Sequence, residues 1–236
     1  MAAAREGQAL GSDIQLSASD GHTLGAYRAD PAAPERACKG GVVVLQEAFG
    51  VNPHIRGVCE AYAAAGYAAI APALYDRQQR NASFGYDPEA TRAALALRRK
   101  LDYAEALRDI AAAVAALRAT GRVGVVGYCV GGSAAWLAAS RLAVDAAACY
   151  YPSDIGKQRD ERPRCPAIMH FAAHDHIVPM AQVEAFRAAH PAVPVHVYPA
   201  EHGFDCVLRP ATHDAASAAL ALTRTLALFA AHVARG

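Results

Sequence analysis

Residues 127–132 read GYCVGG, and this stretch lies between a short apolar run and a helix-like segment. A strand, a G-x-nucleophile-x-G turn and a helix in that order are typical of a nucleophile elbow. Such a turn reverses the chain so sharply that side chains two positions either side of the nucleophile would collide. Gly127 and Gly131 remove both collisions. The pattern predicts that Cys129 stands at the carboxyl end of a parallel sheet.

Two other interpretations of this stretch are open from the motif alone. In the first, Cys129 is a buried apolar cysteine beside a tight glycine turn. In the second, the turn binds a dinucleotide, but the glycines between residues 121 and 131 do not spell G-x-G-x-x-G. In an elbow, Tyr128 precedes the nucleophile and the Val130 backbone N–H points into an oxyanion site at a helix amino terminus.

The chain on either side alternates short apolar runs with longer amphipathic stretches, which predicts an α/β domain with a mainly parallel, doubly wound sheet. Strands are expected at residues 14–18, 23–28, 41–46, 67–71, 122–126, 146–151, 167–171 and 195–198. Helices are expected at residues 54–65, 89–100, 103–119, 133–141, 183–189 and 215–234. The first two strands flank an Asp-Gly turn and should form an antiparallel hairpin. Two helices in one crossover leave room for a partial cap over the sheet edge.

Length and charge indicate one soluble domain of 236 residues. Lys and Arg number 23 against 22 Asp and Glu, and both signs are scattered, so neither nucleic acid nor a membrane surface is the expected partner. No uninterrupted apolar run reaches the roughly 18 residues of a membrane span. Residues 1–12 lack the order of a secretory signal. We expect a flexible segment at 1–12, a single domain at 13–236, a cytoplasmic location and a monomer or small homo-oligomer.

The six cysteines occur singly, with no C-x-x-C pair, so we expect most of them to be reduced, buried and inert. Cys129 is the exception because of its place in the glycine turn.

A cysteine nucleophile needs a base and a carboxylate, and the α/β-hydrolase order is nucleophile, acid, histidine. Asp175 follows the apolar run at 167–171, and His202 follows the run at 195–198. The imidazole must reach the sulfur, and the carboxylate must fix its tautomer. Each residue alone is a weak signal, since Asp175 also fits a loop cap. Order and position together favour a Cys-His-Asp triad.

Histidine and carboxylate side chains are also crowded around Asp175, at His170, His174 and His176. A metal site is the alternative there, but His170 falls within a predicted strand and the neighbouring side chains diverge. We expect no metal and no cofactor. Trp136, on the helix after the elbow, is expected in the core.

Five segments together resemble the dienelactone hydrolase family: the elbow, QEAFG at 46–50, APALY at 71–75, Asp175, and HGF at 202–204. The resemblance runs from residue 14 to the closing helix. It implies a single α/β-hydrolase domain that works without a cofactor. It also implies carboxymethylenebutenolidase activity, the hydrolysis of dienelactone to maleylacetate during chlorocatechol degradation.

The resemblance implies that Cys129, His202 and Asp175 are the catalytic triad. Glu47 matches the family's extra carboxylate, which takes the thiol proton as the substrate binds. A free thiol with a pKa of about 8.5 is only a few per cent thiolate at neutral pH, so activation is needed.

The remaining site residues are also implied by the resemblance. The backbone N–H groups of Ala48 and Val130 would form the oxyanion hole. Arg77 resembles the arginine that receives the substrate carboxylate. Arg209 is displaced from the place expected for the second such arginine, and Phe204 is expected to pack beside the site.

Three functions follow from these residues. The first is a hydrolase of dienelactone-type lactones or esters of small carboxylates. The second is a broader carboxylesterase or thioesterase on the same triad, which the displaced Arg209 favours. The third is a noncatalytic ligand-binding or redox-sensing protein that uses Cys129 as a reactive thiol.

Overall fold

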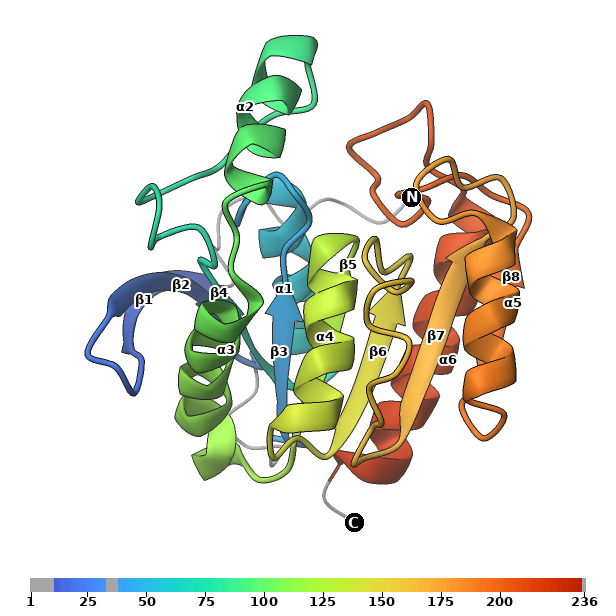
Figure 1. Cartoon of the computed structure of the whole chain (residues 1–236). Helices are drawn as coiled ribbons and strands as arrows, with labels where there is room; N and C mark the ends of the chain where they lie inside the picture. Colours follow the sequence, from blue (N-terminus) through green and yellow to red (C-terminus); the bar gives the residue numbers. More distant parts are fainter. Residues whose placement is uncertain (1–10, 33–37, 235–236) are drawn as a thin grey trace, which may run out of the picture.

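Eight strands form one sheet in the order β1-β2-β4-β3-β5-β6-β7-β8 (Figure 1). The structure is a computed structural model that describes residues 11–32 and 38–234. The strands are β1 (Gly11–Ser17), β2 (Thr23–Ala29), β3 (Gly41–Leu45), β4 (Ala68–Pro72), β5 (Val123–Tyr128), β6 (Ala146–Tyr150), β7 (Ala167–Ala172) and β8 (Val195–Tyr198). Strands β3 to β8 run parallel to one another. At one edge of the sheet, β1 pairs antiparallel with β2, and β2 pairs antiparallel with β4. The predicted α/β class, parallel sheet and leading hairpin are confirmed.

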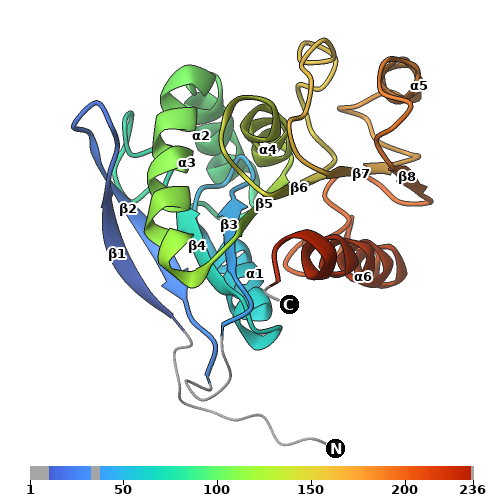
Figure 2. The same cartoon turned by 90° about the horizontal axis from the view of Figure 1, so that it is seen from below.

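Helices cover both faces of this sheet. They are α1 (Pro53–Ala64), α2 (Pro88–Arg98), α3 (Tyr103–Leu117), α4 (Val130–Arg141), α5 (Met180–Ala189) and α6 (Ala215–His232), with a 3₁₀ turn at Arg118–Thr120. Helices α1 and α6 lie on one face, and α3, α4 and α5 on the other (Figure 2). Helix α2 stands above the carboxyl ends of the strands, where the partial cap was expected (Figure 1).

The central strands are buried on both faces, as continuous apolar runs in a parallel sheet should be. In β3, alternate residues enter different cores: Val43 and Leu45 pack with α3 and α4, while Val42 and Val44 pack with α1 and α6. Trp136 of α4 is fully buried, as predicted, and its Nε1 donates to the Gln158 carbonyl at 3.1 Å. This double packing holds the carboxyl ends of the strands in place.

Several element boundaries differ from the sequence expectation, by three residues at the starts of α4 and α5. Helix α4 begins at Val130 rather than at 133, because the turn is completed within one residue and the two glycines are already helical. Residues 1–10 of the predicted flexible segment lie outside the described residues, while Gly11 and Ser12 already belong to β1, where they pair with Ala29 and Arg28.

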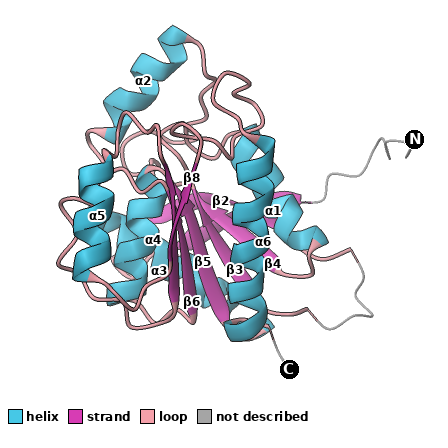
Figure 3. Ribbon diagram, turned by 90° about the vertical axis from the view of Figure 1, so that its right-hand side faces the viewer, coloured by secondary structure: helices cyan, strands magenta, loops and turns pink. Residues whose placement is uncertain are grey.

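The closing helix α6 packs along β6 and β7 (Figure 3). Its buried residues recur every fourth position, at Ser217, Ala221, Thr225 and Phe229. Its 18 residues have a mean hydropathy of 1.2, so by length and composition alone the helix is long and apolar enough to cross a membrane.

Candidate active site

The turn after β5 has the strained backbone that the GYCVGG pattern predicts. Cys129 adopts φ 55° and ψ −115°, in a region that few residues other than glycine occupy. A Cβ atom at Gly127 would lie 2.0 Å from the Gly131 carbonyl oxygen, and one at Gly131 would lie 2.4 Å from that of Leu45. Both glycines are therefore required sterically. The strained cysteine is partly exposed at the carboxyl edge of the sheet.

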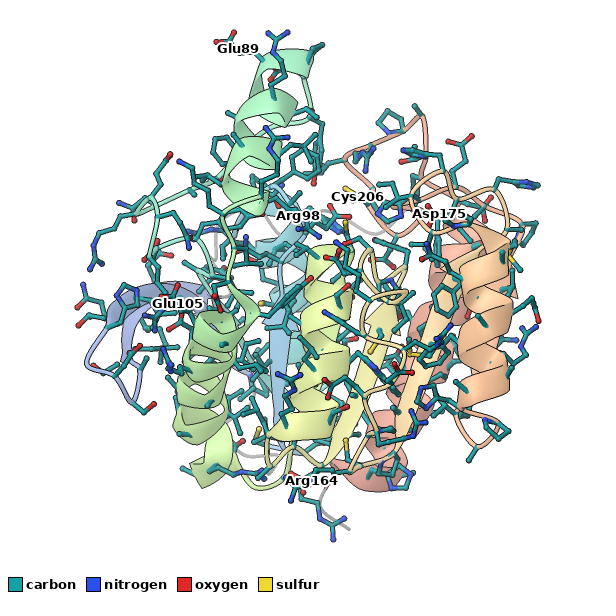
Figure 4. The ribbon with its side chains drawn as sticks, in the orientation of Figure 1. Glu89, Arg98, Glu105, Arg164, Asp175 and Cys206 are labelled. Carbon is teal, nitrogen blue, oxygen red and sulfur yellow. The ribbon has the colours of Figure 1, made fainter. Side chains whose placement is uncertain are left out.

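Asp175 and His202 meet across the loops after β7 and β8. His202 Nδ1 and Asp175 Oδ2 are 2.7 Å apart, and both side chains are at least 96% buried, with exposed fractions of 4% and 1%. The other Asp175 oxygen accepts the backbone N–H groups of Ile177 at 2.7 Å and Val178 at 2.9 Å. All the hydrogen bonds of this carboxylate hold it in one orientation toward the imidazole. Asp175 is one of the residues labelled in Figure 4.

The second ring nitrogen of His202 is buried and, among the described residues, makes no hydrogen bond. Burial by itself lowers the pKa of His202, but the Cys129 sulfur and the Asp175 carboxylate raise it to about 10. The same histidine keeps the pKa of Asp175 below its ordinary value, although burial of that carboxyl acts in the opposite direction. Sulfur, imidazole and carboxylate therefore interact as one electrostatic unit, in the chain order predicted for the triad.

Two backbone N–H groups beside the elbow are free to bind an oxyanion. Ala48 follows β3 and Val130 opens α4, and both residues are at least 95% buried, with exposed fractions of 5% and 1%. Within residues 11–32 and 38–234, neither N–H donates a hydrogen bond. Because the start of α4 packs directly on the end of β3, these donors belong to the same edge of the sheet. Their position is the one expected for an oxyanion hole.

Glu47 is buried at the end of β3, with an exposed fraction of 2%. Its Oε1 accepts a long hydrogen bond of 3.4 Å from the Tyr151 hydroxyl, and its Oε2 has no partner in the described part of the chain. The ring of Tyr151 lies 4.8 Å from that of His202, and Tyr151 itself has a positive φ of 35°. Glu47 is thus connected to His202 through Tyr151, and within residues 11–32 and 38–234 no hydrogen bond joins it to Cys129.

Glu47 also has two neighbours that the sequence analysis did not single out. One carboxylate oxygen of Glu47, a ring nitrogen of His54 and the Cys206 sulfur all lie within 4.8 Å of one another. Burial lowers the pKa of His54, against the opposite effect of Glu47. Burial and Glu47 together raise the pKa of the Cys206 thiol to about 11. His54 and Cys206 come from separate segments and share no motif with Glu47, so no local sequence signal identifies the cluster.

Arg77 has different partners from those that the resemblance implies. Its guanidinium donates to the fully buried Asp109 at 2.7 and 3.0 Å, and it also pairs with Asp20 at 3.0 Å. These bonds tie α3 to the β1–β2 turn and leave only 12% of the Arg77 side chain exposed. The structure therefore places Arg77 in an ion-pair network of the fold rather than beside the triad.

Arg209, by contrast, lies next to His202. Its guanidinium packs over the rings of Phe49 at 5.8 Å and Tyr86 at 5.6 Å. A Cβ atom at Gly203 would lie 2.7 Å from Arg209 Nη1, so the glycine after His202 allows this close approach. None of the ion pairs among the described residues includes Arg209.

The sequence gives no sign of a second arginine near the elbow, Arg98, because it is the last residue of the amphipathic helix α2. Arg98, at the end of α2, forms an ion pair with Asp154. Burial lowers the pKa of Arg98, but nearby groups, Asp154 and Cys129 among them, raise it above its ordinary value. Figure 4 shows Arg98 and Cys206 at the carboxyl edge of the sheet. Phe204 is fully buried against Tyr151 and Tyr198, so it supports the site from behind.

The crowded histidines around Asp175 do not converge. Both ring nitrogens of His170 are hydrogen-bonded to hydroxyl groups, those of Tyr198 at 2.8 Å and Thr225 at 3.1 Å. His174 and His176 are both exposed, and the ring of His176 lies 6.2 Å from that of His202, to which Asp175 is hydrogen-bonded. Asp175 is the residue of this segment that pairs with His202.

Comparison with known proteins agrees with this geometry. A sequence profile of the dienelactone hydrolase family matches residues 24–233. The chain is 36% identical over 226 residues to a carboxymethylenebutenolidase of Pseudomonas putida, covering 90% of this chain and 93% of that one. It is 32% identical over 231 residues to carboxymethylenebutenolidase 1 of Cupriavidus pinatubonensis, covering 94% and 97%.

Among solved structures, the fold matches a crystal structure from Klebsiella pneumoniae that is provisionally named a dienelactone hydrolase. The TM-score is 0.77 at 30% identity, and the match covers 93% of this chain and 99% of that one. The elbow, the sheet order and these relatives lead to the same conclusion: the chain belongs to the dienelactone hydrolase family and is a hydrolase of ester or lactone bonds.

Proposed function

We propose that this hydrolase opens dienelactone-type lactones that bear a carboxylate, through an acyl-enzyme on Cys129. The observation that carries the proposal is the convergence at one sheet edge of a strained cysteine, a buried His202–Asp175 pair and two free backbone donors. These are the parts that acyl transfer requires: a nucleophile, an oriented base and a site for the developing oxyanion.

The reaction begins with activation of the thiol. Glu47, with one oxygen free of hydrogen bonds, takes the Cys129 proton as the substrate binds. The thiolate attacks the lactone carbonyl carbon, and the N–H groups of Ala48 and Val130 hold the oxyanion. Collapse of the tetrahedral intermediate breaks the ring C–O bond and releases an enolate, which remains attached through the acyl chain.

Water completes the reaction. Acylation removes the charge of the Cys129 sulfur, which is one cause of the raised pKa of His202. The imidazole, held by Asp175, then takes a proton from water, and the hydroxide attacks the thioester carbonyl. The C–S bond breaks, the new carboxylic acid releases its proton to solvent and becomes a carboxylate, and the proton on His202 passes to the enolate. Glu47 returns its proton to the Cys129 sulfur, so the enzyme ends in its starting state and one water has been added to the lactone.

Arg209 is the residue that we assign to the substrate carboxylate. It lies beside His202, it is free of any ion pair among the described residues, and its planar guanidinium can hold both oxygens of a carboxylate. Arg98 is less available because Asp154 already engages it. This assignment replaces the role that the resemblance gave to Arg77.

The loss of dienelactone absorbance with purified protein tests the proposal. We expect turnover by the wild type, none above background by Cys129→Ala, and a KM at least about 10-fold higher for Arg209→Ala, because a charged hydrogen bond contributes about 1.5–3 kcal/mol. Arg77→Lys is the matched control and should keep the wild-type KM.

A neutral aryl ester separates lactone hydrolysis from a broader esterase. Arg209→Ala should leave its KM unchanged, because it has no carboxylate to bind. Equal losses on both substrates, or turnover of the aryl ester without any of dienelactone, would contradict the carboxylate-bearing lactone as substrate and leave a generalist hydrolase.

A further inference from the structure

The cluster of Glu47, His54 and Cys206 has the donor set of a metal site, outside the Cys129–His202–Asp175 triad. The three residues come from the end of β3, the first turn of α1 and the loop after β8. One ligand atom from each lies within 4.8 Å of the others, and the exposed fractions are 2%, 5% and 0%. We propose that these side chains bind one Zn²⁺ ion.

Unpaired polar atoms inside the cluster support a ligand there. Glu47 Oε2 and His54 Nε2 are both buried and have no hydrogen-bond partner among the described residues. Buried polar atoms are nearly always paired, and an unpaired carboxylate oxygen is especially unfavourable. A cation bound between a carboxylate oxygen and an imidazole nitrogen would satisfy both atoms at once.

The orientation of α1 is what brings His54 to Glu47. The Asn52 side chain caps this helix by accepting the Ile55 N–H at 3.2 Å, and Pro53 occupies its first turn. The Asn52 amide also donates to the Tyr86 hydroxyl at 3.0 Å, and that hydroxyl contacts the Cys206 sulfur at 3.2 Å. The ligands are therefore held by a hydrogen-bonded surround, as metal sites require.

The chemistry of the donors selects the ion. Thiolate, imidazole and carboxylate together suit Zn²⁺ and leave its fourth position to water. Tetrahedral ligands at Zn²⁺ are about 3.3–3.8 Å apart, as bond lengths near 2.0–2.3 Å require, so a side-chain movement of about 1 Å closes the site. Binding releases the Cys206 proton to solvent, and the carboxylate and thiolate then balance the charge of the ion.

A pocket borders His54 on the side of α6. This pocket of about 430 Å³ between α1 and α6 has His54, Asp205 and His213 on its wall, among mainly apolar residues. The Asp205 carboxylate and the His213 imidazole offer an entering cation its first polar contacts.

Occupancy by Zn²⁺ has a consequence that depends on the proposed role of Glu47. A metal-bound carboxylate oxygen no longer accepts the Cys129 proton, so bound Zn²⁺ should inhibit hydrolysis reversibly. The cluster would then link the activity to the availability of a thiophilic divalent cation.

Titration of metal-free full-length protein with Co²⁺ tests the site directly, because Co²⁺ bound by thiolate gives a charge-transfer absorption band. We expect one equivalent per chain in the wild type and in Cys129→Ser. We expect the band to be lost in Cys206→Ser. In His54→Gln, Co²⁺ affinity should fall by more than about 10-fold, because even changes to residues that only contact the ligands weaken metal affinity by about 10–100-fold. Circular dichroism checks the fold of each variant, and competition with Zn²⁺ gives its affinity.

Two results of the titration would overturn the proposed metal site. A band that survives in Cys206→Ser but vanishes in Cys129→Ser would place the ion on the catalytic thiol. Absence of a band in the folded wild type would show that the cluster holds no metal. Inhibition by Zn²⁺ is measured separately, relative to the metal-free rate of each variant. Co²⁺ binding without Zn²⁺ inhibition would leave the site standing and contradict the role of Glu47.

Discussion

Asp175 and Glu47 are both buried carboxylates at the carboxyl ends of parallel strands, but their surroundings are opposite. Asp175 accepts three hydrogen bonds, from His202, Ile177 and Val178. Glu47 accepts one long bond from Tyr151 and keeps an oxygen without a partner. A carboxylate with its acceptors filled is fixed as an anion, whereas one with an open oxygen is free to take a proton or a cation. We therefore propose that the same chemical group orients the base at one position and accepts the thiol proton at the other.

The largest expected effect comes from Asp175→Asn. The amide cannot accept from His202 Nδ1–H as a carboxylate does, so the imidazole loses both its tautomer and the charge that stabilises its protonated form. We expect kcat to fall by about 10⁴-fold. Steady-state rates on a lactone or aryl ester measure this, with thermal unfolding as the control for folding. A fall of less than about 10-fold would remove Asp175 from the triad.

Glu47→Gln should have a smaller effect, because it removes proton acceptance and leaves the triad in place. We expect the rate to fall by about 10²–10³-fold, within the range of general-base contributions. Alkylation of Cys129 by iodoacetamide gives a second readout: a bound substrate analogue should accelerate it in the wild type but not in Glu47→Gln. If the variant hydrolyses lactone at the wild-type rate, Glu47 is not the proton acceptor.

The pH dependence of stability tests the coupling between Asp175, the fixed carboxylate, and His202. His202 has a pKa raised from 6.5 to about 10, so its contribution is complete below pH 6.5 and is lost as the pH rises through 10. The pKa of Asp175 is lowered from 3.8, so its contribution is present above pH 3.8 and is lost as the pH falls through the lowered value.

The free energy of unfolding of the wild type should therefore exceed that of Asp175→Asn most between about pH 4 and 6.5. Urea denaturation at several pH values measures this difference. A difference that stays constant from pH 6.5 to 10, or grows, would show that His202 and Asp175 are not coupled in this way.

The smallest effect is expected for Tyr151→Phe, which removes the one hydrogen bond of Glu47 and keeps the ring against His202. At 3.4 Å this bond is long, so we expect less than about 1 kcal/mol of lost stability and only a few-fold change in rate. Chemical denaturation and steady-state kinetics are the measurements. A loss comparable to that of Glu47→Gln would mean that Tyr151 itself transfers the proton.

The sequence predicted those features that depend on local sterics and periodicity. The elbow follows from Gly127 and Gly131, whose missing Cβ atoms are needed wherever the chain turns this sharply. Asp175 and His202 followed from strand ends, because parallel strands bring their carboxyl ends to a common edge. The start of α4 at Val130 was predicted three residues late, since glycines disfavour a helix unless close packing demands them.

Features that depend on long-range packing were not accessible from the sequence. No residue near Arg77 in the sequence shows that its guanidinium forms an ion pair with Asp109, which lies in helix α3. Nothing near Arg209 shows that its side chain folds back over Gly203. The meeting of His54 and Cys206 at Glu47 depends on how α1 and the loop after β8 pack on the sheet.

The most direct test of the account is whether Cys129 carries an acyl group during turnover. Protein quenched in acid while hydrolysing a slow aryl ester, with His202→Gln used to slow deacylation, is digested and analysed by mass spectrometry. We predict an increase of one acyl group on the peptide that contains Cys129, and none in Cys129→Ala. Turnover without any adduct, or hydrolysis that persists in Cys129→Ala at the wild-type rate, would contradict a cysteine nucleophile.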